Sequence, residues 1–203
     1  MPRLDATIWQ NTRGEIRARL HARIIAGDDR AAEEEIASLL ARIDCRLFDA
    51  VLTEDFTTAV PAFAAHLDGW IRYAQRAGAA AISVVLERGV GDADLWSCAV
   101  SGLSDRVYPF SRSSREELMM APELSPWRGH ADWSPPDGIL IDGFKNYRVA
   151  DVAYSPADTA DAAVAENLAE MMVGLKYLRF VDAAVRACAA ATPMWVIAED
   201  HDS

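Results

Sequence analysis

The sequence predicts an α+β protein, with about three N-terminal helices followed by a mainly antiparallel sheet of about five to six strands packed with a long C-terminal helix. Apolar residues recur at helical spacing up to Gly78, and beyond it short runs alternate apolar and polar residues as strands do. A doubly wound parallel sheet would need helices and strands to alternate from the start. We therefore expect one α+β domain over residues 1–203, with a helical segment (1–78) and a sheet-containing segment (79–203).

Three helices are expected in the N-terminal segment. The first carries apolar residues four apart within residues 16–24 and ends at Gly27. The second begins with three glutamates, which favour the positive end of a helix dipole. The third begins near Pro61, because proline is tolerated in a first turn, and stops at Gly78. The apolar face of the second helix comprises Ile36, Leu39, Leu40, Ile43, Leu47 and Val51, and that of the third comprises Phe63, Leu67, Trp70, Ile71 and Ala74.

Strands dominate the expected middle of the chain. Residues 81–86 form a β-branched apolar run, and residues 96–101 alternate apolar and polar side chains. The glycine-containing stretch 89–92 between them predicts a hairpin. Further expectations are a strand over 106–110, a short helix capped by Ser113 and Glu116 and ending before Pro122, and a strand pair over 139–141 and 144–154 turned at Asp142 and Gly143.

The C-terminal part is predicted to form a long helix and a final strand. Ser155, Pro156 and Asp158 mark the start of the helix, because serine caps, proline fits the first helical position and an acid suits the first turn. The apolar positions of the helix continue to Val185. Residues 194–198 then indicate a strand, followed by an acidic tail.

The charge balance of the chain indicates which classes of partner to expect. The 31 acidic and 20 basic residues give a net charge of -11, and a negative field opposes the counterion release that drives binding to nucleic acid or an anionic bilayer. We therefore expect neither nucleic acid nor a membrane as a partner, and no segment is long and apolar enough to be a signal or an anchor. The three cysteines are far apart in apolar patterns, which is typical of thiols in a reducing compartment and predicts a cytoplasmic protein.

The positive charge is concentrated near the start of the chain. Residues 1–30 hold six arginines and four acids, whereas the rest of the chain holds 14 basic and 27 acidic residues. Such a layout suits contact with an acidic surface, including that of a second copy of the chain.

Motifs for known catalytic chemistry are weak. No Gly-x-Ser-x-Gly turn occurs, and the glycines at 89 and 91 lead into a strand rather than into a phosphate-binding helix start. His130 and Asp132 could meet an ion only in an extended segment with two further ligands, so we expect no metal and no cofactor. The catalytic residues, if any exist, are not identified by the sequence.

Other polar side chains fit ordinary structural roles. Glu166 and Glu170 lie one helical turn apart and could act in acid–base chemistry if buried, but the neighbouring apolar residues already define the inner face of that helix. We expect both carboxylates to face solvent. His21 and His66 are expected to be packing or surface residues.

The most unusual segment is the proline-rich stretch 121–138, which carries two of the six tryptophans. Tryptophan and arginine are favoured at binding hot spots, which predicts a partner-binding loop. Tryptophans also pin long loops to a core, and prolines stiffen such loops, so a purely structural role stays open. The partner-binding residues under the first interpretation are Trp127, Arg128, His130, Asp132 and Trp133.

This tryptophan-rich loop, placed between hairpin strands and a C-terminal helix–strand unit, resembles uncharacterised bacterial families found among toxin-immunity proteins. The resemblance covers only the loop and the order of elements, implies a protein-binding role and transfers no residues. Our leading hypothesis is a cytoplasmic, non-enzymatic protein-binding protein, of the immunity or antitoxin type, whose acidic face covers a basic effector.

Two alternatives belong to other classes. The chain could be a small-molecule enzyme, hydrolase-like, in which 121–138 is an active-site lid and Arg128, His130 and Asp132 reach into a cleft. It could also be a self-associating structural or regulatory module, such as a homodimer, whose first three helices form the contact.

Overall fold

The computed structural model describes residues 3–53, 56–87, 97–106, 108–119, 139–140, 159–188 and 194–200. The chain divides into two compact units, and the prediction of a single domain over 1–203 stays a prediction. Unit 1 comprises Met1–Asp55 and Asn146–Arg179, and unit 2 comprises Phe56–Lys145 and Phe180–Ser203.

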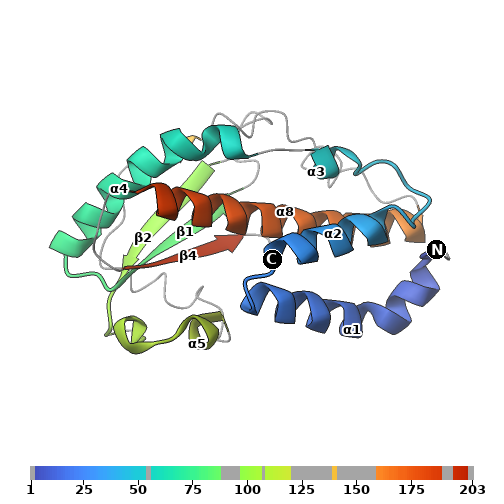
Figure 1. Cartoon of the computed structure of the whole chain (residues 1–203), viewed down its shortest axis with the longest axis horizontal. Coiled ribbons are helices and arrows are strands. Elements are labelled where there is room, and N and C mark those ends of the chain that lie inside the picture. The colour runs from blue at the N-terminus through green and yellow to red at the C-terminus, as the bar shows by residue number, and fades with distance from the viewer. Residues whose placement is uncertain are drawn as a thin grey trace. The chain divides into compact units, whose positions relative to one another are not determined.

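Unit 1 is helical and unit 2 contains the sheet (Figure 1). Unit 1 holds α1 (Ala6–Ile25), α2 (Asp29–Leu40), α3 (Ala50–Thr53) and the larger part of α8 (Ala160–Ala187). Unit 2 holds the 3-10 helix η1 (Thr57–Ala59), α4 (Val60–Arg76), β1 (Ala81–Glu87), β2 (Ser97–Leu103), the 3-10 helix η2 (Phe110–Arg112), α5 (Arg115–Met119), β3 (Ile139–Leu140), the last turns of α8 and β4 (Trp195–Asp200).

The first helix forms and ends just before Gly27, as predicted, and the structure adds a cap at its start. The carboxylate of Asp5 caps α1 by accepting a hydrogen bond of 2.9 Å from the backbone N–H of Ile8. Beyond its end, Gly27 has a φ of 74°, in the left-handed region that favours glycine. One face of α1 is buried and packs with the buried face of α2. The buried residues are Trp9, Ile16 and Leu20 in α1, and Ala32, Ile36, Leu39 and Leu40 in α2.

The second helix is shorter than predicted, because it ends at Leu40 and the chain turns through residues 41–49 before α3. Leu47 is 59% exposed, whereas its neighbour Phe48 is 4% exposed and enters the core instead. The prediction of one continuous apolar face to Val51 was therefore wrong. It arose because the apolar residues of this turn are spaced like those of a helical face. Val51 is buried, but on α3.

The long C-terminal helix exists, but α8 begins at Ala160. The hydroxyl of Thr159 accepts a hydrogen bond of 3.1 Å from the backbone N–H of Ala162, which is the geometry of an N-terminal cap. The predicted start signals at 155–158 lie outside the described residues.

Within unit 1, α8 is tied to the other helices by ion pairs. Asp161 accepts a hydrogen bond of 2.5 Å from Nη2 of Arg3 and one of 3.3 Å from the backbone N–H of Ala6. Further along, Arg179 of α8 forms an ion pair with Glu33 of α2, and Figure 1 shows these two helices side by side.

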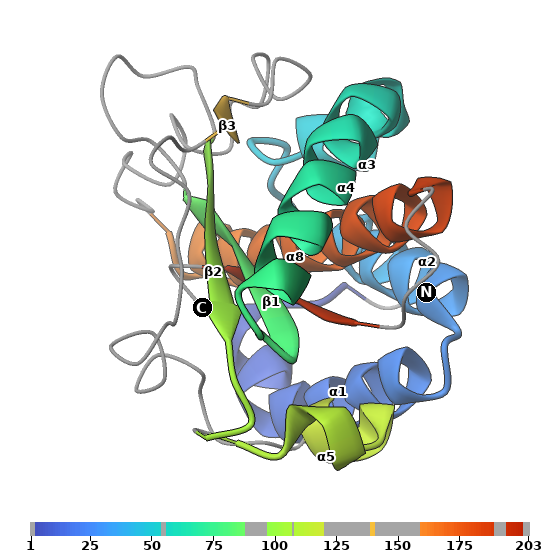
Figure 2. The same ribbon diagram turned by 90° about the vertical axis from the view of Figure 1, so that its left-hand side faces the viewer.

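The sheet of unit 2 is small and mixed, with the strand order β3-β2-β1-β4. Strands β1 and β2 pair antiparallel with Ala81 opposite Leu103, and β4 joins the other edge of β1 in parallel with Trp195 opposite Ala81. Helix α4 lies alongside β1 (Figure 2), and its buried residues are Phe63, Ala64, Leu67, Ile71 and Ala74.

These elements are consistent with the α+β class in its broad sense, but the predicted five-to-six-stranded sheet was wrong. In the part of the chain that the structure describes, helices predominate and the sheet has three strands of six or seven residues plus the two-residue β3. The predicted strand over 106–110 was also wrong, because the described residues there form turns and η2. Phe110 is fully buried against Ala81 and Leu103 as a single anchor. The predicted strand over 144–154 lies outside the described residues.

The capping box before α5 is one residue later than predicted. The hydroxyl of Ser114 accepts a hydrogen bond of 3.2 Å from the backbone N–H of Glu117, and the Glu117 carboxylate accepts one of 2.7 Å from the backbone N–H of Ser114. Ser113 donates its hydroxyl to Pro109 O instead, at 2.9 Å. The hydrogen bonds from Ser114 lower the pKa of the Glu117 carboxyl.

Candidate partner-binding surface

The predicted partner-binding residues Trp127, Arg128, His130, Asp132 and Trp133 lie outside the described residues, as does the whole of the loop around them. Their roles in binding, in a lid or in pinning the loop therefore stay predictions. The remaining candidates can be placed.

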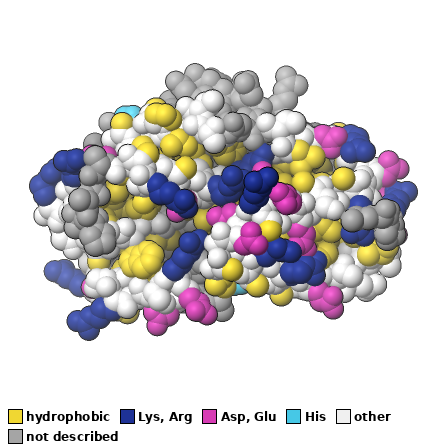
Figure 3. Space-filling model, viewed as in Figure 1, with side chains coloured by type: hydrophobic (Ala, Val, Ile, Leu, Met, Phe, Trp, Pro, Cys, Tyr) yellow, Lys and Arg dark blue, Asp and Glu magenta, His cyan; other side chains and the backbone are white. Residues whose placement is uncertain are grey.

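The basic N-terminal segment is largely neutralised inside unit 1. Four of its six arginines have carboxylate partners, and Figure 3 shows Lys or Arg side chains beside Asp or Glu side chains on the face that it views. Arg13 and Arg17 of α1 are exposed and form no ion pair with any residue that the structure describes. The pairs are Arg3 with Asp161 and Asp44, Arg19 with Glu35, Arg23 with Glu35 and Asp28, and Arg30 with Glu34.

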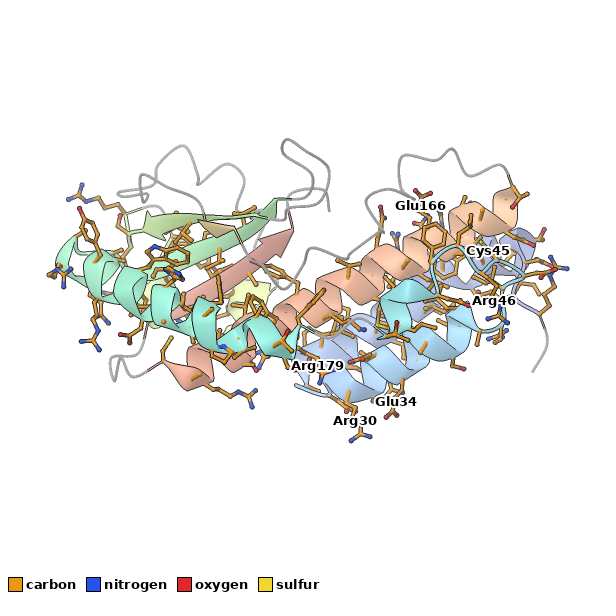
Figure 4. The ribbon with its side chains drawn as sticks, turned by 90° about the horizontal axis from the view of Figure 1, so that it is seen from above. Arg30, Glu34, Cys45, Arg46, Glu166 and Arg179 are labelled. Atoms are coloured by element: carbon orange, nitrogen blue, oxygen red, sulfur yellow. The ribbon has the colours of Figure 1, made fainter. Side chains whose placement is uncertain are left out.

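The carboxylates predicted to face solvent do so in part. Glu170 is exposed and Glu166 partly exposed, and in Figure 4 Glu166 points outward from α8 on the side away from Arg30 and Glu34. Across the described ranges, no three His, Cys, Asp or Glu side chains converge on a point that could hold a metal ion. Nor does any helix in those ranges combine the length and apolar character needed to cross a bilayer.

Cys188, directly after α8, is a half-buried thiol against α4. Its Sγ donates a hydrogen bond to Ala64 O at 3.5 Å. Burial raises the pKa of the Cys188 thiol, and the negative charge of Asp68 raises it further. A raised pKa lowers the thiolate fraction at neutral pH, and the thiolate is the nucleophile.

Cys188 is therefore expected to react slowly with iodoacetamide at pH 8, several-fold more slowly in the folded protein than in denaturant. Asp68→Asn removes the neighbouring charge, should lower the pKa of the thiol and should speed the reaction. Mass spectrometry of the Cys188 peptide at timed intervals measures both rates. Equal rates in folded and denatured protein would contradict the expectation.

Helix α4 carries aromatic and basic residues on the side away from its buried face. His66, Gly69, Tyr73 and Arg76 are exposed, and Trp70 is partly exposed at the border of this side. Their spacing of three or four residues places them along one stripe of the helix. We call these five residues the α4 outer stripe.

The rings of the α4 outer stripe are held by neighbouring side chains. The ring centroids of His66 and Trp70 lie 6.2 Å apart at an interplanar angle of 33°. Trp70 also meets the buried ring of Phe63 edge to face, with centroids 6.0 Å apart. The guanidinium carbon of Arg76 lies 5.7 Å from the ring centroid of Tyr73, which is within the range of a cation–π contact. Each ring of the stripe therefore contacts a neighbouring side chain, although Tyr73 is 48% exposed.

Gly69 leaves an open space in the middle of the stripe. Apart from its two chain neighbours and the backbone of its own helix, a Cβ added there would meet no atom within 4 Å, so the position is open to solvent. A helical glycine is destabilising relative to alanine, because it loses more backbone freedom on folding. The open space next to Trp70 and Tyr73 thus comes at a cost in stability.

Gly69→Ala is accordingly expected to raise the free energy of unfolding by about 0.5–1 kcal/mol. Urea titration followed by circular dichroism measures the change. Gly27→Ala is the matched contrast, because Gly27 has a φ of 74° and alanine should destabilise the protein there. A loss of stability at position 69 would contradict the geometry described.

The charge of the stripe is positive. Asp68, the acid next to it, pairs with Arg72 through a hydrogen bond of 2.9 Å. The other carboxylate oxygen of Asp68 is buried without a hydrogen-bond partner. Arg76 forms no ion pair with the residues that the structure describes, so the cation over Tyr73 is available to a partner.

Sequence reasoning missed this surface. Trp70 was predicted as part of the inner face of the helix and His66 as a packing or surface residue, and the structure places them against each other at the border of the exposed side. The signal in the sequence was the i, i+4, i+7 spacing of His66, Trp70 and Tyr73. That spacing places them on a different side of the helix from Phe63, Leu67 and Ala74.

Comparison of the chain with protein-family models, with curated proteins and with solved structures finds no match. Function must therefore be argued from the surface itself.

Proposed function

We propose that this chain is a non-enzymatic protein-binding protein that uses the α4 outer stripe as a binding surface. The observation that carries the proposal is the exposed Tyr73–Arg76 pair beside the neighbouring rings of His66 and Trp70 on one helix face. Tryptophan, tyrosine and arginine dominate binding hot spots, and rings already held in place lose little side-chain entropy on binding. The free thiols of Cys45 and Cys188 support a search for the partner in the cytoplasm.

A photo-crosslinking residue in place of Tyr73 tests the proposal directly. We expect p-benzoylphenylalanine at this position to yield one or a few discrete protein adducts in cells that express the chain. The same residue in place of Leu47, which is 59% exposed and lies in unit 1, is the matched control and should not yield the same adducts.

The adduct is then tested as a binding partner. The purified partner should bind the wild-type chain, and Tyr73→Ala with Arg76→Ala should weaken binding about tenfold or more. Absence of adducts at position 73, or identical adducts from positions 73 and 47, would count against the proposal.

A second candidate is the immunity or antitoxin type of role, in which the chain covers a basic effector through the tryptophan-rich segment. The residues outside the described ranges include 11 acidic and only 4 basic side chains, so most of the negative excess lies there. That excess supports a cationic partner.

Trp127→Ala and Trp133→Ala distinguish this candidate from the first. If the tryptophan-rich segment binds a basic effector, both variants should weaken the complex while Tyr73→Ala leaves it unchanged. The opposite pattern would assign binding to the α4 outer stripe.

A further inference from the structure

We infer that the occupant of the α4 outer stripe is an acidic amphipathic helix of a partner protein. This inference rests on the proposed function and adds the chemistry of the partner.

The charge of the exposed side of α4 favours an acidic partner. Helix α4 holds Arg72 and Arg76 against a single acid, Asp68, whose carboxylate pairs with Arg72 and whose side chain is only 21% exposed. The exposed side of α4 is thus cationic in a chain whose net charge is -11. Carboxylates of a partner would meet the Arg76 guanidinium directly, and a charged pair shielded by the aromatic rings is stronger than one in open solvent.

The shape of the exposed side of α4 favours a helix as the occupant. The N-terminal half of this side is low, with exposed Ala62, Ala65 and Gly69, whereas Tyr73 and Arg76 stand at the C-terminal end. From residue 62 to residue 76 the surface is about 20 Å long, which matches about four turns of a second helix. A ridge of apolar side chains on such a helix can lie over the open space at Gly69 and contact the rings of Trp70 and Tyr73.

The helical secondary structure of the surface argues against a strand as the occupant. The backbone N–H and C=O groups of α4 are engaged within the helix, so this side offers no sheet edge to which a strand could add. Recognition must therefore use side chains, and an amphipathic helix presents apolar and charged side chains at the matching three-to-four-residue spacing. A second copy that met the first stripe to stripe would bring two cationic surfaces together, and like charges disfavour that pairing.

The test is a titration of the isotope-labelled full chain with a synthetic peptide, followed by NMR. The probe is an amphipathic helical peptide of about 18 residues with leucines along one face and glutamates beside them. In the matched control peptide every glutamate is replaced by lysine. We expect shift changes confined to residues 62–76 and an affinity for the glutamate peptide at least about tenfold above that for the lysine peptide.

Variants locate the contact. Tyr73→Ala with Arg76→Ala should weaken binding about tenfold or more. Gly69→Gln fills the open space, should do the same, and is expected to fold because nothing lies within 4 Å of an added Cβ. The matched control is Arg13→Ala with Arg17→Ala, which removes two exposed arginines from α1 in unit 1 and should change the affinity less than about twofold.

Several results would overturn the inference: no binding of the glutamate peptide, equal binding of both peptides, shifts outside α4, or an equal loss in the α1 control variant. A dimer detected by sedimentation equilibrium and lost in Gly69→Gln would assign the stripe to a second copy and also overturn it. If a crosslink at position 73 persists while the peptide fails, only the chemistry of the partner is wrong. If the crosslink is absent as well, the binding surface itself is refuted.

Discussion

Replacing Phe180 with alanine is expected to lower the free energy of unfolding by about 3–5 kcal/mol. Phe180 is 3% exposed and belongs to the part of α8 in unit 2. Its ring centroid lies 4.8 Å from that of Phe63 in α4 and 6.4 Å from that of Phe56, which it meets edge to face. Truncation to alanine removes the transfer free energy of a buried ring and leaves a cavity that two rigid aromatic neighbours cannot easily fill.

Guanidinium titration followed by circular dichroism measures this loss. Phe180→Leu keeps much of the volume and should cost distinctly less, which separates cavity formation from a general intolerance of the position. Leu47→Ala, at a side chain 59% exposed, should change stability by less than about 0.5 kcal/mol. A loss below about 1 kcal/mol for Phe180→Ala would mean that the aromatic cluster does not form as described.

Replacing Lys176 with alanine is expected to cost about 2–4 kcal/mol. The side chain lies on α8 in unit 1 and is 8% exposed, which is rare for a lysine. Its Nζ donates hydrogen bonds to Val51 O at 2.6 Å and to Leu52 O at 3.4 Å. Alanine removes the buried stem and deprives both carbonyls of α3 of their charged donor.

Two further variants separate these causes. Lys176→Met keeps an unbranched apolar stem and removes only the donor, so it should cost less than Lys176→Ala. Arg186→Ala, on the exposed side of the same helix and one turn from its partner Asp182, should cost less than about 0.5 kcal/mol. If Lys176→Ala were no more destabilising than Arg186→Ala, the lysine would not hold α3 to α8.

The elements that matched the sequence prediction are those bounded by strong local signals. Pro61 in the first turn and Gly78, whose φ is 81°, bound α4 as expected. The predicted end of the second helix was wrong because the chain turns at residues 41–49 without a glycine or proline to mark the turn. Apolar residues in a tight turn can be spaced like a helical face, and only their packing tells the two apart.

By itself the sequence determined the local features of this protein: the end of α1, both ends of α4, the pairing of β1 with β2 and the long final helix. The sequence did not distinguish which serine caps α5, since Ser113 and Ser114 each have a glutamate three residues later, and the structure shows the capping box at Ser114. Tertiary structure decided that β4 joins β1 in parallel, and that Lys176 is buried against carbonyls more than 120 residues away.

The physical reason is the range of the forces involved. Caps, turns and periodic faces depend on neighbours within a few residues, which the sequence displays directly. The parallel pairing of β4 with β1 and the burial of Lys176 depend on which distant surfaces pack together, and periodicity does not encode that choice. On α4 the sequence predicted most of the buried face, but it also assigned Trp70 to that face, and the structure places Trp70 partly exposed at its border.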